Sequence, residues 1–228
     1  MWRFLITLLL IGCGGTTPQW LGHDFLGAPY VESPLGEASA PDSDPLIRFD
    51  AFDCTTFVET VLANGDQGQL NQIRYKNGEI GFLNRNHFIE SDWLLNNSER
   101  VENVSRYYAN TAIRNVIIDK KAWLKKVHGI DSDFESVEIN LEYIPYEHTE
   151  NIVIYKPMIV LFITDNPEIH DKIGTDLAVT HMGIVSPDGI LRHASSEQKM
   201  VVDVPFTEYI NLRKQNKNNI GIALVKIK

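Results

Sequence analysis

Three residues in this sequence have the types and spacing that nucleophilic catalysis requires: Cys54, His181 and His193. The thiolate is the reactive form of cysteine, and the free amides at a helix N-terminus stabilise it. Asp53 acts in the opposite direction, because its negative charge disfavours the thiolate. We therefore expect that Cys54 needs a neighbouring base to take its proton.

The two histidines are predicted to lie on the two arms of one β-hairpin. A strand over 181–186 is followed by a Pro-Asp-Gly turn and by a second strand over 190–193. If the loop has an odd number of residues, both imidazoles point to the same face, directly opposite or one diagonal step apart. His181 can then act as the base for Cys54, while His193 fixes its tautomer.

Each of these residues also has a simpler interpretation when it is taken alone. A buried cysteine is usually a small hydrophobic residue, and a single strand histidine usually belongs to the core or the surface. The other functional interpretation is a two-histidine zinc site. The sequence has no HExxH motif, no paired cysteines at ligand spacing and no obvious third ligand, so we expect neither a metal nor a cofactor.

The nucleophile is expected at the start of a helix. We predict that Asp53 is the N-cap and that Cys54 lies in the first turn. Four apolar residues then recur at helical spacing before an Asn-Gly pair ends the pattern, namely Phe57, Val58, Val61 and Leu62. Two further helices are predicted over 66–75 and 113–126, and no stable helix before residue 53.

The second half of the chain is predicted to form strands. Six short segments are rich in β-branched residues and separated by turn signals, over 137–141, 158–164, 178–186, 190–193, 200–204 and 221–227. Helices first and strands later predict an α+β fold with a mostly antiparallel sheet of about five or six strands. The length of 228 residues suits one core, and we expect a single domain over 25–228.

The N-terminus has the pattern of an export signal. One arginine precedes a short apolar run that is too short to span a bilayer, and the run ends in Leu10-Ile11-Gly12-Cys13. This ending resembles the lipobox of bacterial lipoproteins, which predicts a signal peptide over 1–12, lipidation of Cys13 and a tether over 13–24. The chain is then expected to be exported and membrane-anchored on the periplasmic side of the cell envelope. The alternatives are a plain secretory signal or an apolar N-terminal strand.

The net charge and the number of cysteines bear on the expected partners and on the role of Cys54. Lys plus Arg number 21 against 30 Asp plus Glu, a net charge of −9, and no stretch gathers the basic residues, so nucleic acid is not an expected partner. Lipidation of Cys13 would leave Cys54 without a disulfide partner. A free thiol in an oxidising compartment favours a functional cysteine.

Four motifs, in this order, resemble those of the NlpC-type cell-wall hydrolases. They are Leu26-Gly27-Ala28-Pro29-Tyr30, Phe52-Asp53-Cys54-Thr55-Thr56-Phe57-Val58, His181-Met-Gly-Ile-Val and Arg192-His193-Ala194-Ser195. Thr55-Thr56 and the segment from Arg85 to Trp93 further resemble the N-acetylmuramoyl-L-alanine amidase-like branch. The resemblance implies a papain-like fold whose nucleophile begins a helix packed on the sheet. One departure is Lys156-Pro157, where the family usually has Gly-Asp, which puts the local turn in doubt.

The resemblance also implies a substrate and further site residues. The implied reaction is hydrolysis of the amide between N-acetylmuramic acid and L-alanine in muropeptides or peptidoglycan. Tyr30 and Asp53 would support the nucleophile and the oxyanion. The substrate-cleft wall would comprise Arg85, Asn86, His87, Asp92 and Trp93. A capped loop with Trp93 in the core is the simpler interpretation of that segment.

Two other functions fit the same motifs. One is an endopeptidase that cuts between D-glutamate and the diamino acid of the stem peptide, because bond choice depends on cleft shape. The other is a non-catalytic muropeptide-binding lipoprotein, against which the complete Cys-His-His set argues.

Overall fold

The computed structural model describes residues 21–228. The predicted signal peptide over 1–12 and the lipidation site Cys13 lie outside the described residues, as does most of the predicted tether over 13–24. Within the described residues, no helix has the length and apolar character needed to cross a membrane.

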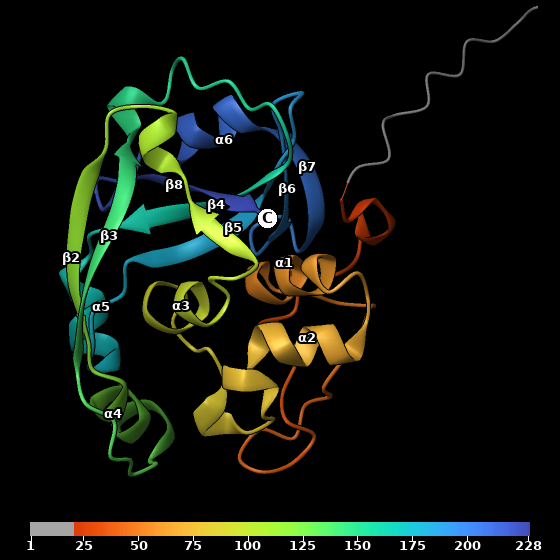
Figure 1. Ribbon diagram of the computed structural model, residues 1–228, viewed down its shortest axis with the longest axis vertical. Coiled ribbons are helices and arrows are strands. Elements are labelled where there is room, and N and C mark those ends of the chain that lie inside the picture. Colours follow the sequence, from red (N-terminus) through yellow and green to blue (C-terminus); the bar gives the residue numbers. More distant parts are fainter. Residues whose placement is uncertain (1–20) are drawn as a thin grey trace, which may run out of the picture.

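Eight strands within residues 21–228 form one antiparallel sheet, which runs across the molecule in Figure 1. Their order is β2-β3-β8-β4-β5-β6-β7, and β1 pairs with β8. The strands are β1 (Val101–Asn103), β2 (Ala112–Ile118), β3 (Val137–Pro145), β4 (Met158–Thr164), β5 (Val179–Val185), β6 (Ile190–Ser195), β7 (Met200–Pro205) and β8 (Asn219–Ile227).

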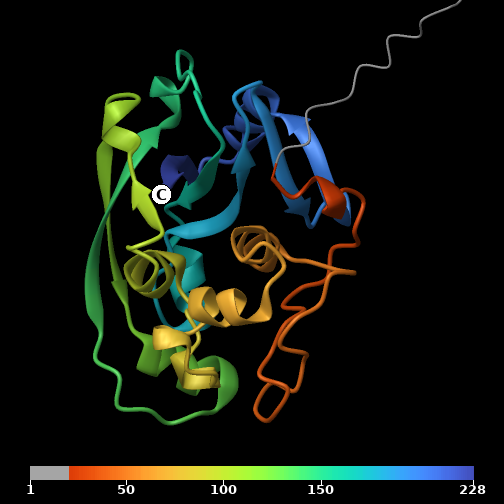
Figure 2. The same ribbon diagram turned by 45° about the vertical axis from the view of Figure 1, so that its right-hand side comes forward.

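Helices cover both faces of this sheet. The α-helices in the described part of the chain are α1 (Cys54–Leu62), α2 (Gln67–Arg74), α3 (Leu94–Asn96), α4 (Lys120–Trp123), α5 (Pro167–Ile173) and α6 (Phe206–Arg213). Figures 1 and 2 show α1 and α2 on one side of the sheet and α6 on the other. Two π-helical segments, Ile89–Trp93 and Leu124–His128, complete the cover on the α1 side.

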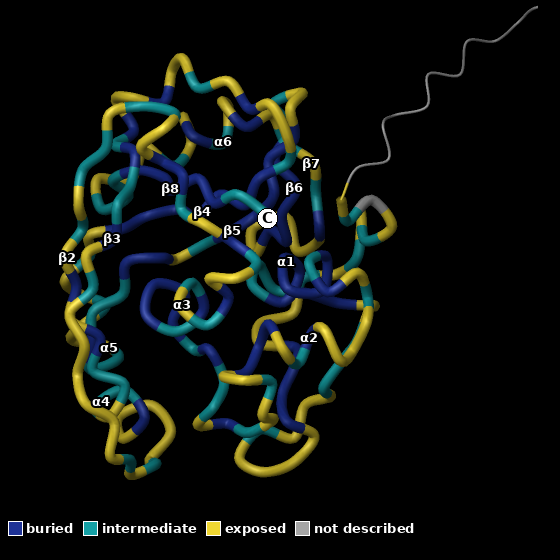
Figure 3. Tube along the Cα trace, in the orientation of Figure 1, coloured by how far each residue is buried: buried dark blue, intermediate teal, exposed yellow. Residues whose placement is uncertain are grey.

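The central strand β4 contributes side chains to two hydrophobic cores, one on each face of the sheet. Ile159, Leu161 and Ile163 pack into the core that contains α1 and α2. The alternate β4 residues face the core that contains α6. Side chains alternate across a strand, so a strand buried on both faces must be apolar throughout, as in the run MIVLFIT. Figure 3 shows β4 in the dark blue of buried residues.

The local signals around Cys54 fold as predicted. Asp53 caps α1 through its side chain, which accepts a hydrogen bond from the Thr56 amide at 2.7 Å. The Thr56 hydroxyl in turn accepts from the Asp53 amide at 3.0 Å, which completes a capping box. Cys54 is therefore the first residue of α1, and the helix packs against β5 and β6. The predicted helix over 66–75 is confirmed as α2.

The prediction of a helix over 113–126 is wrong for its first half. Residues 112–118 form β2, whose side chains alternate between exposed and buried, with Val116 and Ile118 in the core. β-Branched residues favour this extended conformation. The helix α4 begins only at Lys120, with Asp119 as its N-cap. The expected five or six strands are therefore eight, because β1 and β2 add to the six predicted ones. Helices and strands also alternate more than predicted.

The segment before α1 is fixed to the domain by buried hydrogen bonds. The Arg74 guanidinium donates to the Leu35 carbonyl at 3.1 Å, and the Tyr75 hydroxyl donates to the Gly36 carbonyl at 2.9 Å. The Arg85 guanidinium forms ion pairs with Glu37 at 2.6 Å and Asp42 at 2.8 Å. These contacts hold the loop beside the N-terminus of α1.

Candidate active site

Cys54 is the free cysteine among the described residues, and it is partly buried at the start of α1. Burial and the neighbouring Asp53 carboxylate raise the pKa of its thiol to about 11, although the Met182 backbone and Thr55 oppose the rise. The helix terminus alone therefore does not generate a thiolate at neutral pH. This agrees with the expectation that the thiol requires a base.

The two predicted histidines meet. Nε2 of His181 lies 2.8 Å from Nδ1 of His193, and the rings are nearly perpendicular with centroids 4.8 Å apart. Burial, the other imidazole and the Arg213 cation lower the pKa of His181 well below its ordinary value. Burial and Arg213 lower the pKa of His193 to about 4, although Asp203 opposes this. Both imidazoles are thus neutral at pH 7.

The hairpin register confirms the predicted geometry. Ile184 pairs with Arg192 and Val185 with Leu191, so paired residue numbers have an even sum and the two histidines share a face one diagonal step apart. Gly183 makes this approach possible. A Cβ added there would lie 2.9 Å from the Cβ of His193 and 2.9 Å from the Arg192 carbonyl oxygen.

Cys54 and His181 line the same cavity, which has a volume of about 300 Å³. Because Nε2 of His181 is bonded to His193, its Nδ1 is the nitrogen left to take a proton from a group in the cavity. The remaining lining residues are Thr55, His87, Ile89, Leu177, Val179, Thr180 and Met182. The cavity therefore combines a thiol, a neutral base and a largely apolar wall.

Tyr30 is placed close to Cys54 by backbone pairing. It forms a parallel bridge with Phe52, and the Val31 amide donates to the Phe52 carbonyl at 3.0 Å. Burial, then the Cys54 and Asp53 charges, raise the pKa of its hydroxyl to about 12. The hydroxyl therefore stays protonated and can act as a hydrogen-bond donor.

Three of the five predicted cleft-wall residues line a second cavity of about 170 Å³, namely Arg85, Asn86 and His87. This cavity shares Thr55 and His87 with the Cys54 cavity, so the two adjoin. His87 Nε2 lies 2.7 Å from the Phe82 carbonyl oxygen. Burial lowers the pKa of His87 well below its ordinary value, so its ring is neutral at pH 7.

The other two predicted wall residues lie behind this surface. Asp92 is paired with the Lys120 ammonium at 2.9 Å. Trp93 is fully buried, and its indole N–H donates to Glu59 at 3.1 Å. In the structure, Trp93 is thus a core residue that supports the wall without an exposed surface of its own.

Sequence analysis did not identify four polar residues near the site. Glu59 on α1 is buried and paired with Arg74 at 3.1 Å. Glu90 is buried beside the start of β5, where Oε1 accepts a hydrogen bond from the Ala178 amide. Tyr209 on α6 packs its ring 4.7 Å from that of His193, and Arg213 follows one turn later. A pattern of acidic residues at buried helical positions could have signalled Glu59, but α6 is too remote in sequence to have been linked to the histidines.

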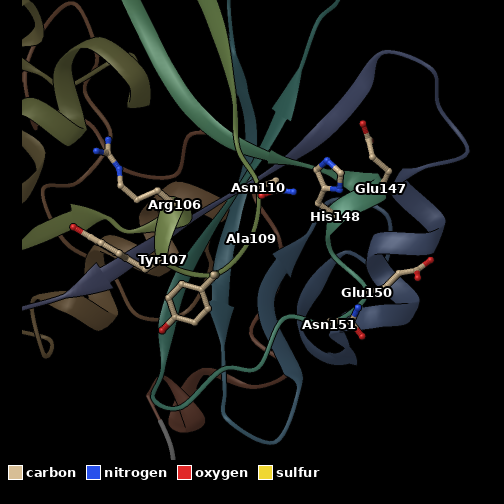
Figure 4. Close-up of a pocket in the computed structure, with 9 residues that line it drawn as sticks. Arg106, Tyr107, Ala109, Asn110, Glu147, His148, Glu150 and Asn151 are labelled. Carbon is tan, nitrogen blue, oxygen red and sulfur yellow. The ribbon is translucent and has the colours of Figure 1, made fainter.

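A larger cavity of about 530 Å³ lies outside this site. Figure 4 shows Arg106 and Tyr107 on one side of it and His148 and Glu150 on the other. It contains none of the predicted site residues. Across the described part of the chain, no group of three or more His, Cys, Asp or Glu side chains is arranged to hold a metal ion.

Comparisons with known proteins identify one family. The model of the AmiA-like family, described as N-acetylmuramoyl-L-alanine amidase-like, matches residues 20–220. Comparison with curated proteins finds no match.

Several solved structures are similar. A protein from Legionella pneumophila str. Philadelphia 1 is 26% identical with a TM-score of 0.82, covering 90% of this chain and 86% of that one. An N-acetylmuramoyl-L-alanine amidase from Bacteroides uniformis is 25% identical with a TM-score of 0.66, covering 91% and 95%. A Bacteroides fragilis structure with a provisional xylanase name is 25% identical with a TM-score of 0.65, covering 90% and 98%.

Proposed function

The chain belongs to the AmiA-like, N-acetylmuramoyl-L-alanine amidase-like family, and from this premise we propose that it is a cysteine hydrolase. Its substrate is the amide between N-acetylmuramic acid and L-alanine in peptidoglycan fragments. The observation that carries this proposal is the arrangement of Cys54 and His181 around one cavity, with His193 2.8 Å behind the base. This arrangement supports the roles of nucleophile, base and orienting group that a papain-like site requires.

In the first half of the reaction, Nδ1 of His181 takes the proton from the Cys54 thiol as the sulfur attacks the lactyl carbonyl carbon. The bond to the L-alanine nitrogen then breaks, and the leaving amine receives the proton from His181. The products of this half are a free stem peptide and a thioester between Cys54 and the muramoyl group. His193 accepts a hydrogen bond from Nε2 of His181 throughout, which keeps the required tautomer.

In the second half, water attacks the thioester and gives its proton to His181, which returns it to the departing sulfur. The backbone amide of Cys54 is an oxyanion donor, because the first amides of a helix have no intrahelical partner. The Tyr30 hydroxyl is a second donor. Removing one such donor typically costs about a hundredfold or more in rate.

Other activities are less consistent with the site. A glycosidase needs two carboxyl groups about 5–9.5 Å apart across the bond that it cuts. Among the described residues that line the Cys54 cavity, none is an Asp or Glu. A zinc amidase would need ligands where His181 and His193 are bonded to each other. The stem-peptide endopeptidase uses the same three residues, so only the products separate it from the amidase.

The test is mass spectrometry of defined muropeptides after incubation with residues 21–228. We expect free N-acetylmuramic acid-containing sugar and intact stem peptide, loss of both with Cys54→Ala or an alkylating agent, and no loss with a chelator. Cleavage inside the peptide would favour the endopeptidase. Absence of any cleavage would favour the muropeptide-binding protein.

A second part of the proposal concerns location. The Leu10-Ile11-Gly12-Cys13 sequence supports an exported lipoprotein anchored on the periplasmic side of the membrane. Metabolic labelling with a fatty acid should mark the full-length chain and should fail with Cys13→Ser. Labelling that persists in this variant, or none in the parent, would overturn the assignment.

A further inference from the structure

The helix α6 covers the sheet face that bears the imidazole pair. The ring centroid of Tyr209, on this helix, lies 4.7 Å from that of His193 and 5.9 Å from that of His181. The same ring contacts Phe162 of β4 edge-on at 5.0 Å. Tyr209 thus packs against the two histidines and against Phe162, and these contacts fix the position of α6 over the imidazole pair.

Arg213 is the last residue of α6, one turn beyond Tyr209, and its guanidinium is held from three directions. Nη2 donates to the Thr180 hydroxyl and to the Asn219 side-chain oxygen, both at 3.2 Å. The guanidinium carbon lies 5.6 Å from the centroid of Phe162, as in a cation–π contact. Thr180 directly precedes the base and lines the Cys54 cavity, so Arg213 is tied to the wall of the active site.

The charges around the imidazole pair are unequal. The Arg213 cation on α6 lowers the pKa of both imidazoles, whereas the Asp203 carboxylate on β7 raises the pKa of His193. Asp203 is already neutralised by a bidentate ion pair with Arg192, with both distances 2.7 Å. The Cys54 thiol on α1 is uncharged at neutral pH. A net positive field therefore acts on the two rings, in addition to their burial.

We propose that Arg213 is a positioning residue whose fixed guanidinium holds the strand at Thr180 and keeps the imidazole pair in the neutral form that a base requires. This inference rests on the proposed thiol mechanism. A base that resists protonation by solvent stays able to accept the thiol proton at acidic pH. Once His181 has taken that proton from Sγ, the nearby cation makes the imidazolium a stronger acid, which favours proton transfer to the leaving amine.

The test compares Arg213→Gln with Arg213→Lys, which keeps the charge, and with Arg106→Gln, which removes a positive charge at the exposed cavity of Figure 4. The titration of the two imidazoles is followed by NMR, and kcat/KM for a muropeptide is measured from pH 4 to 8. We expect Arg213→Gln to move the titration and the acid limb to higher pH, so that activity at pH 4 relative to pH 8 falls roughly threefold or more. Arg213→Lys and Arg106→Gln should keep the parental titration.

An unchanged titration in folded Arg213→Gln would overturn the proposal. If that variant does not fold, titration of the parent at rising salt replaces it, because screening of the partly exposed cation should raise the pH at which the imidazoles titrate. No salt response would then overturn it. The NMR readout needs no turnover, so a parent that titrates as expected but cleaves no muropeptide would refute the hydrolase function and leave only the effect of Arg213 on the imidazole titration standing.

Discussion

The helix α1 carries two ionisable groups that the protein treats in opposite ways. At its first residue, the Cys54 thiol has a weak contact of 3.9 Å with the Thr55 hydroxyl. On β6, Nε2 of His193, the residue bonded to His181, is buried without a partner. Five residues after Cys54, both oxygens of Glu59 are bonded, one to Arg74 and one to Trp93, at 3.1 Å each. The thiol that we propose as nucleophile therefore has only a weak side-chain contact, whereas the Glu59 carboxylate has a hydrogen-bond partner for each oxygen.

This difference follows from what each group must do. A nucleophile and its base have to change protonation state and partner during turnover, and strong fixed hydrogen bonds would oppose both changes. A buried ion pair has to keep its partners, because losing one leaves an uncompensated charge in the interior. Substitutions at the first group should therefore affect rate and substitutions at the second should affect stability.

The largest expected effect is on rate, at the nucleophile. Cys54→Ala should lower kcat/KM by roughly 10⁴-fold or more, since no other group can form the thioester. Thermal unfolding should change little, because alanine keeps the helix backbone and removes only one sulfur atom, whose contact with Thr55 is weak. Circular dichroism melting beside the muropeptide assay checks both. A large loss of stability with retained cleavage would contradict this prediction, because Cys54 would then serve the structure and not the reaction.

The next largest effect is on stability, at the buried ion pair. Arg74→Met leaves the Glu59 carboxyl unpaired, and burial already raises the pKa of this group to about 7. We expect the free energy of unfolding to fall by about 3 kcal/mol or more at pH 8, and by less at pH 5, where the carboxyl is protonated. Urea titration at the two pH values measures this.

The matched control is the double variant Arg74→Met with Glu59→Gln, which removes the charge that is left unpaired. It should recover part of the stability at pH 8. If the single variant is as stable as the parent at pH 8, the ion pair does not hold the N-terminal loop and the contrast along α1 fails.

A smaller effect on rate is expected at the orienting imidazole. His193→Ala removes the acceptor of the hydrogen bond that fixes the tautomer of His181, and kcat should fall about a hundredfold while KM changes little. Steady-state kinetics with one muropeptide separates the two parameters. A rise in KM with kcat intact would show that His193 contacts substrate and does not act through His181.

Much of the site follows from sequence because its signals are local. Asp53 as N-cap, Cys54 in the first turn and the shared face of the two histidines depend only on helix capping and strand parity. The strand β2 was missed because its apolar residues also fit a helical period. The contacts of α6 with the histidines and Thr180 join segments that are far apart in sequence. No pattern in the residues around Arg213 predicts them.

The smallest effect is expected at Glu90, which has one bonded oxygen, as in Glu59, and one oxygen without a partner. Oε1 accepts from the Ala178 amide, but Oε2 is buried without a partner. Burial raises the pKa of Glu90 to about 7, above its value of about 4.3 in an unfolded chain. Its contribution to stability is therefore present below about pH 4 and lost as the pH rises through 7. Glu90→Gln should reduce the loss of stability between pH 5 and pH 8 by on the order of 1 kcal/mol, as measured by urea unfolding; an unchanged pH dependence would argue against this assignment.

The central claim is that Cys54 forms a thioester with the muramoyl group, and hydroxylamine trapping tests it most directly. Hydroxylamine competes with water for the thioester and converts the acyl group to a hydroxamate. We predict a hydroxamate on the lactyl carboxyl of N-acetylmuramic acid, detected by mass spectrometry, and none with Cys54→Ala. A hydroxamate on the stem peptide would assign a different bond. Cleavage that yields no hydroxamate and persists in Cys54→Ala would contradict the thiol mechanism.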